Sequence, residues 1–245
     1  MKNILIIGAA SAIAQETAKC FAKDDAHLFL VDISLGRLEA VRDDILARDK
    51  INIELDVLDV NDFDKHNIIF QKAVETLGGL DAILIAHGTL PDQIKTQENP
   101  ELIRKEFITN GLSVISLASI AANYFEQQGK GCIAVISSVA GDRGRQSNYI
   151  YGSAKGAVSI FLQGLRNRLA PKGVNVLTIK PGMVDTPMTA HLPKSPLFAK
   201  PSLVGRGIYN AMKEGKDVVY LPGYWRLIMF IIKLIPEAIF KKMKL

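Results

Sequence analysis

The stretch NILIIGAASAIAQETAKC, residues 3–20, decides the fold of this 245-residue chain. It begins with a continuous apolar run, NILII, which is typical of a buried strand in a parallel sheet. Residues 11–23 have the composition of a helix, and the turn between the two elements, GAASAIA at 8–14, contains one glycine, Gly8. A strand, a tight turn and a helix in this order predict the start of a βαβ unit.

Apolar runs and helical stretches alternate along the rest of the chain. The expected strands are 3–8, 27–32, 51–57, 80–88, 131–138 and 174–182, and the expected helices are 11–23, 35–49, 62–77, 99–128 and 149–170. Near-continuous apolar strands indicate a sheet that is covered on both faces, and right-handed β–α–β connections wind it in both directions. We therefore predict a single-domain, doubly wound α/β Rossmann fold over residues 1–222. Its sheet is expected to be seven-stranded and mostly parallel, with helices on both faces.

Composition limits the class of protein. The hydrophobic fraction is 48% and the charged fraction 22%, as in a globular chain. Cys20 and Cys132 lie far apart in apolar segments, which predicts reduced, buried thiols in a cytoplasmic protein rather than a disulfide. The N-terminus enters a strand directly and has no signal-peptide pattern.

The positive charge is concentrated at the C-terminus. The net charge is +5, and from Trp225 onward five basic residues (Arg226, Lys233, Lys241, Lys242 and Lys244) stand against Glu237. The body is therefore nearly neutral, which argues against a nucleic-acid-binding face on it. The basic tail, residues 223–245, instead indicates possible contact with an anionic surface.

Polar residues that follow the strands form the candidate site, because ligands of doubly wound sheets bind beyond the carboxyl ends of the strands. In SSVAGDRGRQSNYIYGSAKG, residues 137–156, Tyr151 and Lys155 are four apart and share one helix face. A lysine cation beside a tyrosine favours the phenolate and makes it an acid or base. Ser138 ends the preceding strand, where its hydroxyl can hold a carbonyl or alcohol oxygen. The alternative is a surface Tyr and Lys on an amphipathic helix.

With these residues the sequence resembles the short-chain dehydrogenase/reductase family over residues 1–222. The resemblance implies an oxidoreductase that transfers hydride between a nicotinamide cofactor and a ketone or secondary alcohol. It makes Tyr151 the proton donor, and Lys155 the group that lowers the pKa of Tyr151 and binds the nicotinamide ribose. Ser138 rather than Ser137 matches the family serine, and Tyr151 rather than Tyr149 the family tyrosine. Asn110 matches the asparagine that supports a proton-relay water.

The family's cofactor loop, Gly-x-x-x-Gly-x-Gly, aligns with Gly8, Ala12 and Ala14. Gly8 keeps the turn, while alanine is compatible with the first turn of the helix. Ser11 can cap that helix, so the backbone N–H groups that hold a pyrophosphate remain. We expect the loop to bind a cofactor; the alternative is a cofactor site that has been lost.

Asp32 ends the second strand, where a carboxylate accepts the ribose hydroxyls of NAD and repels the 2′-phosphate of NADP. Arg37 is the nearest basic residue. We expect NAD(H) to be preferred over NADP(H). The resemblance also assigns cofactor contacts to Ile13, Asp56, Val57, Ala86, His87, Gly88, Pro181, Gly182, Val184 and Thr186, besides Tyr151 and Lys155. Of these, Asp56 and Val57 would flank the adenine. His87 stands in Ala86-His87-Gly88, where the family usually has Asn-Ala-Gly. A purely structural role for His87 is the alternative to a contact with the cofactor. The histidines show no metal-ligand spacing, so no metal is expected.

Residues 227–240 would span about 21 Å as a helix, short of a hydrocarbon core of about 30 Å. The tail is therefore expected to lie on a membrane surface or to dock on the body or a second subunit; both remain open. With AHGTL and the alanine-substituted loop, it resembles the subgroup that contains the reductase of decaprenylphosphoryl-2-keto-erythro-pentose.

That likeness implies a lipid-linked keto-sugar substrate and a cytoplasmic enzyme peripheral to the inner membrane surface. The alternatives are a reductase of a soluble or carrier-bound keto compound and a non-catalytic dinucleotide-binding scaffold. The family implies a homodimer or homotetramer built on helices 99–128 and 149–170. We expect residues 183–202 to form a lid over the substrate.

Overall fold

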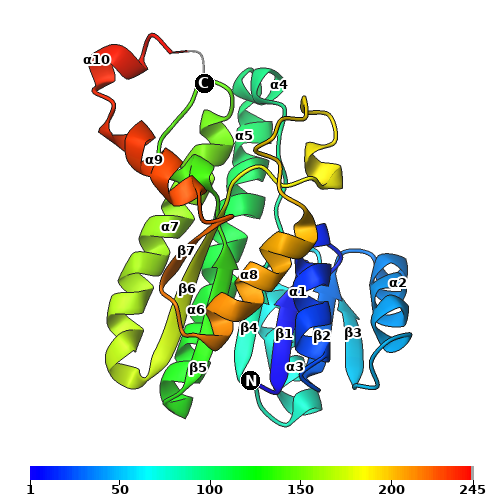
Figure 1. Cartoon of the computed structure of the whole chain (residues 1–245). Coiled ribbons are helices and arrows are strands. Elements are labelled where there is room, and N and C mark those ends of the chain that lie inside the picture. Colours follow the sequence, from blue (N-terminus) through cyan, green and yellow to red (C-terminus); the bar gives the residue numbers. More distant parts are fainter. Residues whose placement is uncertain (244–245) are drawn as a thin grey trace.

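The computed structural model describes residues 1–243, so the last two residues of the expected C-terminal extension, 244–245, lie outside the described residues. Within these residues, one seven-stranded sheet has the order β3-β2-β1-β4-β5-β6-β7, and every neighbouring pair is parallel. The strands are β1 Asn3–Ile7, β2 His27–Asp32, β3 Ile53–Val57, β4 Ala82–Ile85, β5 Gly131–Ile136, β6 Val174–Pro181 and β7 Val218–Leu221. The predicted doubly wound Rossmann fold is confirmed (Figure 1).

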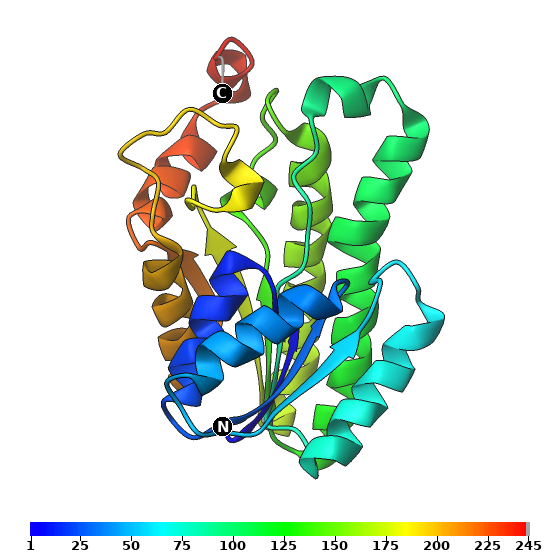
Figure 2. The same cartoon turned by 90° about the vertical axis from the view of Figure 1, so that its right-hand side faces the viewer.

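Helices cover both faces of the sheet (Figures 1 and 2). One face carries α1 Ala12–Ala22, α2 Leu35–Leu46 and α8 Pro201–Lys213. The other carries α3 Asp64–Leu77, α6 Ser113–Gln128 and α7 Tyr149–Leu169. Alternate side chains of each strand point to opposite faces of the sheet. In β1, Ile4 and Ile6 pack with α1, α2 and α8, whereas Leu5 and Ile7 pack with α3, α6 and α7. Full burial of one such side chain contributes about 1.5–3 kcal/mol, so the core stabilises the sheet from both sides.

The predicted helix 99–128 is observed as three consecutive pieces. These are α5 Pro100–Phe107, a π-helical turn Ile108–Leu112 and α6, and Asn99 caps the start. By length and composition Pro100–Gln128 could cross a membrane, but half of its apolar window is buried, and it packs on α3 and α7 in this fold. The sequence prediction did not assign β7, α8 or the short helix α4 Gln93–Gln97.

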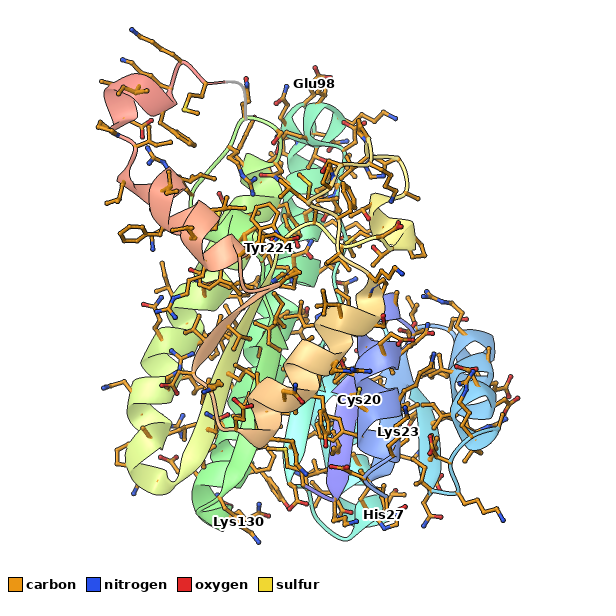
Figure 3. The ribbon with its side chains drawn as sticks, in the orientation of Figure 1. Cys20, Lys23, His27, Glu98, Lys130 and Tyr224 are labelled. Carbon is orange, nitrogen blue, oxygen red and sulfur yellow. The ribbon has the colours of Figure 1, made fainter. Side chains whose placement is uncertain are left out.

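The C-terminal segment docks on the body through one face. It forms α9 Trp225–Leu234 and α10 Glu237–Phe240, drawn in red in Figure 1. Trp225 and Met229 are buried against Val139, whereas the opposite face of α9 is exposed. Figure 3 shows Tyr224 at the base of α9, and its hydroxyl donates a hydrogen bond to the carbonyl of Leu197, 3.0 Å away. The extension is therefore joined to the segment that we expected to be a lid.

Both cysteines are free, as predicted. Cys132 is buried on β5, and burial raises the pKa of its thiol to about 12. Cys20 on α1, labelled in Figure 3, is half-buried rather than buried.

Candidate active site

A cleft of about 830 Å³ lies beyond the carboxyl ends of the strands. It is bounded by the turns after the first six strands, β1 to β6, and by the segment after β6 that the sequence predicts as a lid. That segment is held at its base by a bridge between Val184 and Ala199. In Figure 2 this segment, drawn in yellow, lies at one end of the molecule. α9 and the loop after β5 lie at the same end. The order of the strands explains the position of the cleft. Because β1 lies between β2 and β4, the chain connections diverge beyond the carboxyl end of β1.

The turn after β1 retains the geometry of a dinucleotide loop. Gly8 has φ +77°, and a Cβ there would lie 2.5 Å from the backbone nitrogen of His87, so no side chain fits. Ser11 caps α1, and its Oγ accepts a hydrogen bond from the backbone N–H of Ala14, 3.3 Å away. Ala12 lines the cleft at the helix N-terminus, where a methyl group causes no backbone strain. These residues fit a pyrophosphate placed on backbone N–H groups.

Asp32 and Arg37 both line the end of the cleft next to this turn. The Asp32 carboxylate accepts a hydrogen bond from the N–H of Ala10, 3.1 Å away. The Arg37 guanidinium donates to the carbonyl of Ala10, 2.8 Å away. A carboxylate suited to ribose hydroxyls and a guanidinium suited to a phosphate are therefore held by the N–H and the carbonyl of the same residue, Ala10.

The cleft lining after β3 differs by three positions from the pair expected beside the adenine. Asp56 and Val57 do not line the cleft; Asp56 pairs with Lys72, 2.7 Å away, and Val57 is exposed. Asp59 and Val60 line it instead. The sequence LDVLDV repeats the Asp-Val pair, and the first copy is used in the strand, where Val57 aligns with the last residue of β2.

Tyr151 and Lys155 lie on the first turns of α7, and both line the cleft with Ser138. The Nζ atom of Lys155 lies 5.9 Å from the centroid of the Tyr151 ring and donates to the carbonyl of Ile136, 3.2 Å away. Burial raises the pKa of Tyr151 to about 12, and hydrogen bonding with Ser138 offsets part of this increase. Burial lowers the pKa of Lys155 to about 8. In this geometry burial outweighs the hydrogen bond with Ser138, so the pKa of Tyr151 is raised rather than lowered as expected, and Tyr151 holds its proton.

Close backbone contact sets the position of Ser138. A Cβ on Gly141 would lie 2.7 Å from the carbonyl carbon of Lys155, so the turn after β5 sits directly on α7. The Oγ of Ser138 accepts from the N–H of Ala140, 3.0 Å away, which leaves its own proton to donate. Ser137 instead hydrogen-bonds the carbonyl of Lys155, 3.0 Å away, and the hydroxyl of Ser159.

Tyr149, the second tyrosine of the motif, is exposed, and its hydroxyl donates to the side chain of Gln97, 2.8 Å away. It does not line the cleft. The geometry therefore agrees with the sequence motif, since Tyr151 lines the cleft and Tyr149 does not.

Asn110 is buried in the π-helical turn and lies behind the cleft wall. Its Oδ1 accepts from the N–H of Thr89, 3.0 Å away, and its Nδ2 donates to Glu106, 2.8 Å away. A Cβ on Gly88 would lie 2.8 Å from Oδ1 of Asn110 and 3.4 Å from Nζ of Lys155. The missing side chain at Gly88 thus lets the amide approach the lysine. Such π turns occur often at functional sites.

His87 has one nitrogen in a structural bond and one without a partner. Ser113 donates to the carbonyl of Thr109, so it accepts the proton from Nε2 of His87, 2.8 Å away. Nδ1 of His87 is buried and has no hydrogen bond within residues 1–243. Burial and the charge of Lys155 lower the pKa of His87 to about 3, so the ring is neutral.

The remaining predicted residues, Ile13, Ala86, Gly88, Pro181, Gly182, Val184 and Thr186, all line the cleft. Sequence reasoning did not select Arg145, Asn148 and Trp225, which line it as well. Trp225 comes from the extension beyond residue 222, and a Cβ on Gly182 would lie 1.9 Å from its ring. The only signal for it in the sequence is that it is the single tryptophan.

Comparison with known proteins agrees with this architecture. The chain is 29% identical over 240 residues to an uncharacterized oxidoreductase of Mycobacterium tuberculosis, covering 98% of this chain and 96% of that protein. It is 26% identical over 220 residues to the 3-oxoacyl-[acyl-carrier-protein] reductase FabG of Thermotoga maritima, covering 89% and 88%.

Two solved structures have a similar fold. Levodione reductase superposes with a TM-score of 0.84 at 21% identity and covers 92% of this chain and 98% of its own. ElxO with NADP bound has a TM-score of 0.82 at 25% identity and covers 92% and 99%. The family model described as short chain dehydrogenase matches residues 2–196, most of the chain. The chain therefore belongs to the short-chain dehydrogenase family and is an oxidoreductase.

Proposed function

We propose that this protein is an NAD(H)-dependent reductase of ketones, or in reverse a dehydrogenase of secondary alcohols. The observation that carries the proposal is that Ser138, Tyr151 and Lys155 line the same cleft as a turn that fits a pyrophosphate. The bound nicotinamide supplies the hydride. The hydroxyl of Ser138 donates a hydrogen bond to the substrate oxygen, and Tyr151 gives that oxygen its proton.

The other residues support this proton transfer. A pKa of about 12 keeps the proton on Tyr151 near neutral pH, as a proton donor requires. Lys155 supplies a positive charge and donors for ribose hydroxyls, and its own burial makes that charge sensitive to pH. Asn110 lies next to Lys155 behind Gly88, in the position of a group that steadies a proton relay.

The substrate class is a further part of the proposal. The exposed apolar face of α9, with Arg226 and Lys233 on the same helix, supports a lipid-linked keto-sugar that stays at a membrane surface on the cytoplasmic side. The likeness to an acyl-carrier-protein reductase supports the alternative of a carrier-bound keto substrate. A homodimer or homotetramer through α5–α6 and α7 is proposed from family membership.

The catalytic proposal is tested by NADH oxidation with a panel of ketones, using the wild type and Tyr151→Phe. Removal of the proton donor is expected to lower kcat by about 10²–10⁴-fold, while NADH binding by fluorescence titration stays within about twofold. Tyr149→Phe is the matched control, because that hydroxyl bonds Gln97 outside the cleft. Equal turnover by Tyr151→Phe and the wild type would assign the proton to another donor, and NADH binding without turnover of any ketone by the wild type would favour the non-catalytic scaffold.

A further inference from the structure

The loop between β5 and α7 carries a guanidinium that has no partner among residues 1–243. Arg145 lines the cleft, its Nε is out of contact with solvent, and its side chain has no hydrogen bond or salt bridge within residues 1–243. Arg143, two residues earlier, differs completely: it donates to three backbone carbonyls of the tail and pairs with Glu237, 3.0 Å away. Buried polar groups in folded proteins are nearly always hydrogen-bonded. Arg145 is therefore available to a group that the chain does not supply.

Asn148 repeats the pattern three residues later. Its Oδ1 is buried without a partner in the described part of the chain, although Asn148 stands at the N-cap position of α7. An N-cap side chain ordinarily bonds the first turn of its helix, and this one does not. An unpaired donor and an unpaired acceptor thus occur together on one short loop that lines the cleft.

The charges of the cleft lining are separated along its length. Among residues 1–243 the acidic residues that line it are Asp32 and Asp59, which follow β2 and β3. The cation Arg37 lies at the same end as Asp32, whereas Lys105, Arg145 and Lys155 come from α5, the β5–α7 loop and α7. Burial lowers the pKa of the Arg145 guanidinium, and no carboxylate offsets this effect. The end of the cleft that holds Tyr151 is therefore cationic and not neutralised by its own lining.

We propose that Arg145 and Asn148 form a substrate subsite, in which the guanidinium binds an anionic group and the amide oxygen accepts a bond from a substrate hydroxyl. This rests on the proposed function and specifies its substrate as a hydroxylated ketone that bears a phosphate or a carboxylate. Arg145 lies between Ser138 and Tyr151 in the chain, whereas the pyrophosphate loop lies on β1–α1. The guanidinium is thus assigned to the substrate and not to the cofactor. Its planar fork suits both anions.

The test measures binding without turnover. Trp225 is the single tryptophan and lines the same cleft, so its fluorescence reports ligands there. In Tyr151→Phe protein saturated with NAD⁺, dihydroxyacetone phosphate is compared with dihydroxyacetone, and 4-oxopentanoate with its methyl ester. We expect at least about tenfold tighter binding of the charged member in one pair, which also identifies phosphate or carboxylate as the preferred anion.

Adding Arg145→Gln is expected to abolish that preference, and Arg145→Lys to restore part of it. Arg168→Gln, which removes the pair between Arg168 on α7 and Glu126 on α6 away from the cleft, is the matched control and should keep the preference. The proposal is overturned if neither charged compound binds more tightly than its neutral partner, or if the preference survives in Arg145→Gln.

Wild-type NADH oxidation, followed separately, distinguishes the two proposals. Ketone reduction that shows no dependence on Arg145 overturns the subsite alone. Arg145-dependent anion binding without NADH oxidation by any ketone overturns the reductase proposal and leaves the subsite intact.

Discussion

At the scale of single residues, burial controls the chemistry of the cleft. The same low polarity raises the pKa of Tyr151 to about 12 and lowers that of Lys155 to about 8, since burial disfavours the charged form of each group. Around neutral pH, Tyr151 is then protonated and Lys155 is charged. That combination suits the direction in which a ketone receives a proton.

The first prediction concerns pH. The Lys155 ammonium is present below about pH 8 and is lost as pH rises through that value, because its pKa is lowered from 10.5. We expect kcat/KM for ketone reduction to fall above about pH 8, approaching tenfold per pH unit. Lys155→Met should lower the rate by about 10²-fold or more and remove this limb of the profile. A profile unchanged in shape in that variant would assign the titration to another group.

The second prediction concerns the cofactor. Asp32→Ala removes a carboxylate suited to ribose hydroxyls, so NADH should bind about tenfold more weakly, and NADPH more tightly, as repulsion of the 2′-phosphate is lost. Arg37→Ala is the matched variant and should weaken NADPH more than NADH. Fluorescence titration of both cofactors measures these changes. Tighter binding of NADPH than NADH by the wild type would overturn the preference and assign Arg37 the dominant role.

Site residues could be predicted from the sequence only where neighbouring residues carry the signal. Gly8 and Ser11 could be predicted, since a positive φ and a helix cap are set by residues within one turn. Asp59 was missed because its repeat three residues earlier has the same sequence and only the sheet register separates the copies. Arg145 carries no local signal at all; its lack of a partner is a property of the folded cleft.

At the scale of elements, a buried ion pair holds the β5–α7 loop to the sheet. Asp142 on this loop pairs with Lys180 on β6, and its second oxygen accepts from the hydroxyl of Tyr220 on β7, 2.6 Å away. Both charges are almost fully buried. The loop that carries Ser138 and Arg145 is thereby fixed against two strands that the lid separates in sequence.

The third prediction tests this connection. Lys180→Met leaves the Asp142 carboxylate buried with only the Tyr220 hydroxyl, and we expect the free energy of unfolding to fall by about 3–5 kcal/mol in chemical denaturation. Lys213→Met removes an exposed pair with Asp24 and should change it little. A small loss in Lys180→Met would mean that water or loop movement solvates Asp142.

Elements were predictable where their pattern was long. The apolar strands β1 to β6 and the helices between them match the predicted ranges closely. β7 was missed because it is a four-residue edge strand with no buried residue, and α4 has only five residues. The π turn around Asn110 carries no separate sequence signal, since its neighbours on both sides are helical.

At the scale of the whole molecule, the C-terminal extension is part of the site as well as its outer wall. Trp225 lines the cleft, and the Arg143 guanidinium lies 3.8 Å from the centroid of the Phe240 ring and donates to the carbonyls of Ile232 and Ile235. The sequence left docking on the body and contact with a membrane as alternatives. In the fold, one face of α9 docks on the body. The opposite face is exposed, and contact with a membrane is the alternative that concerns this face.

The last prediction therefore concerns the outward face of α9, which presents Leu227, Phe230 and Leu234, each more than half exposed, at helical spacing. With Arg226 and Lys233 beside them, these side chains suit the interface of an anionic bilayer. We expect the protein to float with liposomes that contain phosphatidylglycerol and to bind neutral liposomes more weakly. Phe230→Ser with Leu234→Ser should abolish flotation and leave NADH binding unchanged, because the buried side of α9, Trp225 and Met229, is untouched. Ile68→Ser, at an exposed apolar residue on α3, controls for a general loss of hydrophobic surface. If flotation is absent while the double variant lowers the mass measured by light scattering, the face joins two copies of the chain, and the substrate need not be held in a membrane.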